Sequence, residues 1–243
     1  MRGCHAFKNL DWLITSFFLV SAPAQEPHYK FTTGYYSSTG GGLPHDQGVD
    51  LNVRRASAAG NAWLAWYRSP VQEVSQPRLG WDNQFELTSH WRVQPSMQIA
   101  SGGFLGGSIY AETGKHWVAG AGLGRTNLRH YVNLNFDPND AWTAAAGYRW
   151  NSQQSLLLQV VRDNRNNPDQ QNMHMIYRMP LPEGHRLVID VTHKSGTVDD
   201  QFIRKSGLSI AYDWPTVFVH LAYDPYVNFT PQKMWRASVG TRF

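Results

Sequence analysis

The sequence has almost no cysteine and no long apolar run. Cys4 is its single cysteine, and it lies in a segment that we expect to be removed on export. A mature chain without cysteine excludes thiol catalysis and cysteine-based zinc sites. No stretch of about 18 apolar residues occurs, which excludes helical membrane spans. The formal net charge of +4 is too small to indicate nucleic acid as a partner.

The N-terminus has the pattern of a secretory signal peptide. Arg2 and Lys8 precede a short apolar stretch over residues 12–20, and Ala22 and Ala24 supply the small residues of a cleavage site. Cys4 has no lipobox around it, which argues against a lipoprotein anchor. The sequence therefore predicts a signal peptide over residues 1–24 and one exported domain over residues 25–243.

The last ten residues read as a membrane-spanning strand. Their alternate positions separate an apolar face from a face with two arginines, because successive side chains in a strand point to opposite sides. About 9–11 tilted residues of this kind cross a bilayer. The apolar face carries Trp235, Ala237, Val239, Thr241 and Phe243.

A terminal Phe closing such a strand resembles the assembly signal of Gram-negative outer-membrane β-barrel proteins. The likeness is to the class, not to one family within it. It implies that the outer-membrane barrel assembly machinery recognises Trp235, Val239 and Phe243. It also implies location in the cell outer membrane, contact with outer-membrane lipids and a monomeric chain.

Alternating segments upstream predict an all-β fold, a closed antiparallel barrel with an up-and-down meander of about 14 strands, 12 being the alternative. Aromatic residues near strand ends suggest two membrane-interface belts, and a soluble β-sandwich is the competing interpretation. Longer connectors on the side away from Phe243 place that end outside the cell. The predicted strands cover residues 28–36, 47–55, 61–68, 80–91, 97–111, 115–124, 128–136, 140–150, 154–162, 170–179, 185–194, 204–214, 216–224 and 234–243.

The inward faces predict a ring of basic side chains at the periplasmic mouth, with Asp213 nearly the only acid beside it. Such a ring biases permeation toward anions. The alternatives are cross-strand ion pairs and contacts with inner-leaflet phosphates. The predicted ring consists of Lys30, Arg54, Arg92, Arg129, Arg149, Arg178, Arg186 and Arg242.

Three aromatic residues are predicted to face the lumen: Trp66, Tyr131 and Phe218. Beside the amides of Asn133 and Asn135 they would suit a polar oligomer such as a sugar chain. The plainer interpretation is that they fill the interior of a small barrel.

His193 and Ser195 form the one catalytic-looking pair. Their spacing is similar to the H-x-S arrangement of outer-membrane phospholipases and lipid A deacylases, in which an outward His activates a Ser. The outward residues of the next strand, Arg204, Ser206 and Leu208, include no Asn, Asp or Glu to orient the ring.

No metal-ligand spacing or nucleotide-binding motif occurs, so we expect no metal and no cofactor. The sequence favours a passive channel or export pore that passes anions or polar oligomers. The alternatives are a lipid hydrolase using His193 and Ser195, and a structural or exopolysaccharide-associated barrel without transport.

Overall fold

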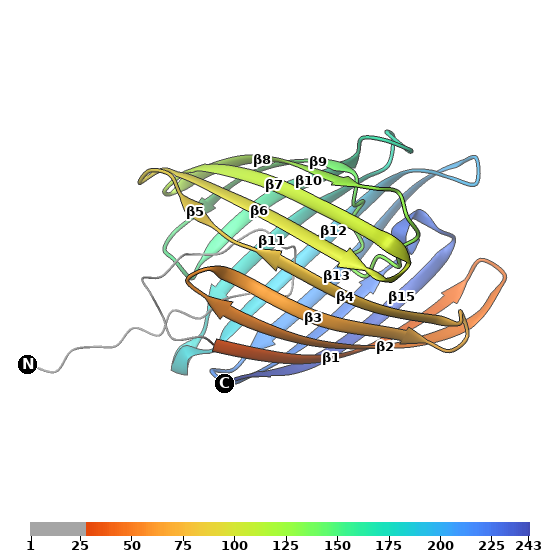
Figure 1. Ribbon diagram of the computed structural model, residues 1–243. Helices are drawn as coiled ribbons and strands as arrows, with labels where there is room; N and C mark the ends of the chain where they lie inside the picture. Colours follow the sequence, from red (N-terminus) through yellow and green to blue (C-terminus); the bar gives the residue numbers. More distant parts are fainter. Residues whose placement is uncertain (1–27) are drawn as a thin grey trace, which may run out of the picture.

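The computed structural model describes residues 28–243, so the predicted signal peptide lies outside the described residues. These residues form one sheet that is closed into a barrel of 14 strands plus the two-residue strand β5 (Figure 1). The strands are β1 (His28–Gly40), β2 (Leu43–Ser57), β3 (Gly60–Ser69), β4 (Val74–Asp82), β5 (Phe85–Glu86), β6 (Trp91–Ala100), β7 (Phe104–Gly114), β8 (Trp117–Thr126), β9 (Ala141–Arg149), β10 (Ser155–Asp163), β11 (Gln171–Pro180), β12 (Arg186–Val198), β13 (Gln201–Asp213), β14 (Val217–Asp224) and β15 (Gln232–Arg242).

Two pairings close the barrel, and every pairing is antiparallel. The first strand, β1, pairs with the last, β15, over eleven residues from Lys30↔Arg242 to Gly40↔Gln232. Strand β4 pairs with β6 and bypasses the short β5. The prediction of a closed antiparallel meander of about 14 strands is therefore confirmed. We call the end of the barrel where Tyr29 bonds to Phe243 the terminal end, and the opposite end the loop end.

Three predicted strands are wrong, although the count agrees. The strand predicted over 80–91 lies earlier in the chain, as β4 over Val74–Asp82. Residues 97–111 are not one strand, because Gly102 and Gly103 turn the chain between β6 and β7 with φ of 75° and 76°. Residues 128–136 form no strand; they belong to the connection between β8 and β9. The hairpin of β12 and β13 is longer than expected and turns at Asp199 and Asp200, whose positive φ fits a two-residue hairpin turn.

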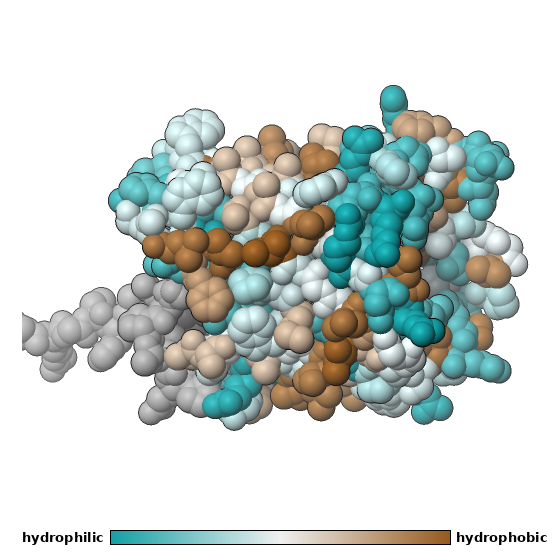
Figure 2. All heavy atoms as spheres, turned by 45° about the horizontal axis from the view of Figure 1, so that its top comes forward, coloured by the Kyte–Doolittle hydropathy of each residue, from teal (hydrophilic) through white to brown (hydrophobic). Residues whose placement is uncertain are grey.

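The outer surface alternates as a bilayer-facing barrel should. Outward residues such as Leu158, Leu208 and Leu221 are exposed. Rings meet near the terminal end, where Trp117 and Trp150 each pack against Tyr148. Figure 2 shows apolar residues across the visible face and hydrophilic residues gathered toward its right side. Among residues 28–243, no helix is long and apolar enough to cross a membrane.

Candidate functional site in the barrel lumen

The connection between β8 and β9, residues 127–140, folds into the barrel; we call it the inner loop. Its centre, Leu134, is only 2% exposed and packs among Tyr36, Tyr67 and Met234 on inward faces of the wall. The loop therefore narrows the lumen. Tyr131 stacks on Phe104 at the start of β7, with ring centroids 4.1 Å apart.

Hydrogen bonds fix the inner loop to one side of the wall. The Gln76 amide donates to the Val132 carbonyl at 3.1 Å and accepts from the Val132 N–H at 2.9 Å. Arg236 of β15 donates to the Leu134 carbonyl, and its guanidinium lies 4.7 Å from the ring centroid of Phe136. Backbone polar groups inside a barrel need such partners, since an unpaired buried one is costly.

Asp137 fixes the loop to the opposite side. One of its oxygens accepts from Asn172 at 2.7 Å and contacts Nε2 of His174 at 3.0 Å, while Nδ1 of His174 contacts Asp190 at 2.9 Å. Both ring nitrogens of His174 face carboxylates, so a protonated ring satisfies both contacts. Burial raises the pKa of Asp137, but His174 and Asn172 outweigh it and hold the pKa below its ordinary value.

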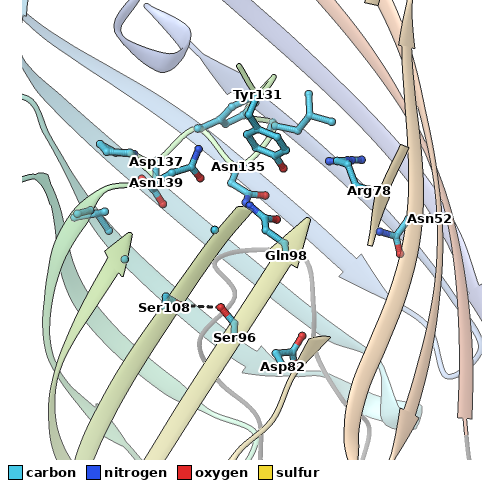
Figure 3. A pocket seen from close by; sticks show the side chains of 18 of the residues that line it. Asn52, Arg78, Asp82, Ser96, Gln98, Ser108, Tyr131, Asn135, Asp137 and Asn139 are labelled. Atoms are coloured by element: carbon cyan, nitrogen blue, oxygen red, sulfur yellow. Dashed lines mark hydrogen bonds between the residues drawn. The ribbon is translucent and has the colours of Figure 1, made fainter. Parts of the chain in front are cut away.

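A cavity of about 320 Å³ occupies the lumen beside the inner loop. Its lining runs from Arg54 and Asp82, near the terminal end, to Thr126, near the loop end. The close-up in Figure 3 shows Asn52, Arg78, Asp82, Ser96, Gln98, Ser108, Tyr131, Asn135, Asp137 and Asn139 around it. Most of these side chains are polar, as in a passage for water-soluble molecules.

The charge of the cavity lining varies between neighbouring strands. Arg78 of β4 forms an ion pair with Asp50 of β2 and also bonds to the Tyr131 hydroxyl. On the next strands of the wall, β6 and β7, Ser96 and Ser108 bond to each other at 2.7 Å and carry no charge (Figure 3). This part of the lining therefore presents an ion pair next to uncharged hydroxyl groups.

An apolar layer fills the lumen over β8 to β13, toward the terminal end. Ile176 is completely buried at its centre. The layer consists of Val118, Leu157, Ile176, Val188 and Ala211, and none of them lines the cavity. The cavity therefore approaches the terminal end beside this layer, along the side of the barrel that contains β1 to β4.

Seven of the eight basic residues predicted for the mouth lie near the terminal end, each within the first or last four residues of its strand. Arg129 does not, because residues 128–136 are loop rather than strand; it is exposed on the inner loop. Of the seven, only Lys30 and Arg54 line the cavity.

The mouth holds more acidic side chains than the sequence predicts. Arg54 pairs with Asp82, Arg92 and Arg149 pair with Glu112, and Arg186 and Arg242 pair with Asp213. The Glu112 side chain is 1% exposed, and Arg149 holds both of its oxygens, at 2.7 and 2.8 Å. Cross-strand ion pairs, the alternative interpretation, therefore account for five of these residues.

The three predicted lumen aromatics have different positions. Tyr131 lies in the lumen, but on the inner loop. Phe218 is fully buried beneath Lys30 and Arg242. Trp66 is 38% exposed on the outer face, where its N–H donates to Ser75.

The inward aromatics of β3 are Trp63 and Tyr67 instead. Their rings lie over Gly80 and Gly48 respectively, where an added Cβ would come within 2.5 Å of ring atoms. Aromatic residues occur on both faces of β3, so alternation alone does not reveal which face points inward. The facing glycines are the signal that could have done so.

The proposed catalytic residues share the outer face but are not bonded to each other in this structure. Nδ1 of His193 lies 3.2 Å from the Ser206 hydroxyl, on the neighbouring strand. The Ser195 hydroxyl instead accepts from the Gln171 amide at 3.3 Å. No group of three His, Cys, Asp or Glu side chains suited to a metal occurs among residues 28–243.

Comparison with solved structures finds barrels of the same kind. Omp33, an outer membrane protein of Acinetobacter baumannii, is 10% identical, with a TM-score of 0.56 over 89% of this chain and 98% of that chain. The chain has the fold of an outer-membrane β-barrel.

Two further solved barrels resemble the chain with lower TM-scores. The NanC porin is 11% identical, with a TM-score of 0.47 over 87% of this chain and 98% of that chain. The translocator domain of the autotransporter NalP from Neisseria meningitidis is 10% identical, with a TM-score of 0.48 over 92% of this chain and 89% of that chain. No family model and no curated protein matches the sequence.

Proposed function

We propose that this barrel is a passive channel of the outer membrane, with the inner loop as its constriction. The polar cavity carries the proposal, because its lining extends from near one end of the barrel to near the other. The likeness to Omp33 supports the fold on which the proposal rests. The terminal end faces the periplasm, since the longest connection, residues 127–140, lies at the other end.

The solutes are small, polar and preferably anionic. Lys30 and Arg54 stand where the cavity approaches the periplasmic mouth, and Asp82 neutralises part of their charge. A residual positive potential in a narrow, low-dielectric passage concentrates anions. The inner loop excludes long or bulky molecules, because Leu134 and Tyr131 occupy the centre of the lumen.

Planar bilayers test this proposal. Purified protein should give discrete conductance steps, and in a KCl gradient the reversal potential should show weak anion preference that fades as salt rises. An absence of conductance from folded barrels would favour the structural role. Conductance with cation preference would retain the channel and reject its proposed selectivity.

A further inference from the structure

A second charged surface lies on the outer face at the loop end, around Trp142 of β9. Trp142 is 57% exposed, and its neighbours in register are Leu123 of β8 and Arg162 of β10. Arg125 follows Leu123 by two residues, so it points outward one step nearer the loop end. Below this level the outer face is apolar, as the 57% exposed Leu158 shows.

Three arginines gather around this tryptophan, and each bonds to a residue at the loop end. Arg125 bonds to the side-chain oxygen of Asn164. Arg165 donates to the Thr126 carbonyl at 2.8 Å, and Arg162 donates through Nε to the Pro168 carbonyl at 2.6 Å. We call Arg125, Trp142, Arg162 and Arg165 the rim patch.

Two carboxylates lie near the arginines of this patch: Asp140 contacts Arg125 and Arg165, and Asp169 lies near Arg162. Asp140 accepts from Arg165 at 3.0 Å and lies 4.0 Å from Arg125. It also accepts from the hydroxyl and N–H of Thr126. Burial raises the pKa of Asp140, but these hydrogen bonds outweigh it and keep the pKa below its ordinary value. Another nearby acid, Asp163, accepts from three backbone N–H groups of its own loop.

Each guanidinium therefore retains N–H donors for a further acceptor. Arginine carries several donors in a planar fork that matches phosphate oxygens. The side chains of Arg125 and Arg165 are 47% and 37% exposed. The exposed Trp142 beside them is at the depth where such rings meet lipid headgroups.

We propose that the rim patch binds the phosphorylated headgroup of lipid A, with acyl chains against the apolar face below. This rests on the proposed orientation, which places the loop end in the outer leaflet. The arginines would clasp a phosphate, Trp142 would lie against the sugar ring, and Leu158 would contact an acyl chain. The bound lipid would brace the connections around the inner loop, since Arg165 also contacts Thr126 and Asp140.

Native mass spectrometry of the whole barrel in detergent tests the proposal without conductance. The ligands are diphosphorylated lipid A, its dephosphorylated form and phosphatidylglycerol. Wild type should retain diphosphorylated lipid A preferentially. The double variant Arg125→Gln/Arg162→Gln should bind it about tenfold more weakly or worse, because charged hydrogen bonds are lost.

A control variant removes the same charge elsewhere on the barrel. Arg68→Gln/Lys233→Gln changes two exposed residues away from the patch and should bind like wild type. Equal loss in both variants, or equal binding of dephosphorylated lipid A, would overturn the proposal. Preference for phosphatidylglycerol would overturn the choice of lipid. Because the assay needs only a folded barrel, it would still test lipid binding if the protein proved not to conduct.

Discussion

The mouth offers two double variants that remove equal charge but should act differently. Lys30→Gln/Arg54→Gln changes residues that line the cavity, whereas Arg92→Gln/Arg149→Gln changes the two arginines that hold Glu112 outside it. The first pair should move the reversal potential toward cation preference, and the second should leave it unchanged. Salt separates a field effect from other causes, since screening acts over about 10 Å at 0.1 M and about 30 Å at 0.01 M.

The loss of thermal stability should be larger for Arg92→Gln/Arg149→Gln than for Lys30→Gln/Arg54→Gln. Glu112 is 1% exposed in its side chain and accepts from both arginines, so their removal leaves a buried carboxylate without its two ion-pair partners. Breaking a buried pair in this way costs about 3–5 kcal/mol. Asp82, by contrast, keeps its 2.8 Å bond from Asn61 when Arg54 is replaced, and the loss should be smaller.

The assays are reversal potential in a KCl gradient and the midpoint of thermal unfolding, followed by heat-modifiable mobility on gels. If Arg92→Gln/Arg149→Gln moved the reversal potential as far as Lys30→Gln/Arg54→Gln, the cavity would not be the conducting path. If neither pair changed the reversal potential at any salt concentration, the basic residues of the mouth would have only a structural role.

Three further predictions concern the inner loop, assembly and the outer face. Asp137→Ala should increase fluctuations of the single-channel current, because the loop loses its contact with His174. In wild type the same increase should occur only in acid, since the pKa of Asp137 is lowered and the contact is lost as pH falls through that pKa. Quiet channels in the variant would refute this. Deleting Phe243 should reduce the yield of folded barrel on gels, because two backbone bonds and a stacked ring join it to Tyr29; an undiminished yield would contradict it. Purified protein should not hydrolyse phospholipid or lipid A, and activity abolished by Ser195→Ala would show that the hydrolase interpretation is correct.

Much of the barrel could be predicted from alternation, because a membrane barrel repeats one simple pattern along every strand. The inner loop could not. Val132, Leu134 and Phe136 alternate with polar residues as a strand would. Leu134 is buried by inward residues of the wall rather than by a neighbouring strand, and alternation does not distinguish these two environments.

The mouth was only partly predictable for a related reason. The predicted strand ended at residue 111, so Glu112 was not among the residues expected at the mouth. In the structure Glu112 is the partner of two arginines. Asp82 was assigned to the other end of the barrel, because the β4 strand was expected to begin at residue 80 rather than end near it. One misplaced turn reverses the direction of a strand, and with it the end at which each charge lies.

Thiol block of the current tests the conducting path most directly, since Cys4 is the only cysteine of the sequence. Ser96→Cys lies on the cavity and Ile176→Cys in the fully buried apolar layer. A bulky cationic thiol reagent should reduce the current through Ser96→Cys channels and leave Ile176→Cys channels unaffected. Block at Ile176→Cys without block at Ser96→Cys would contradict the account.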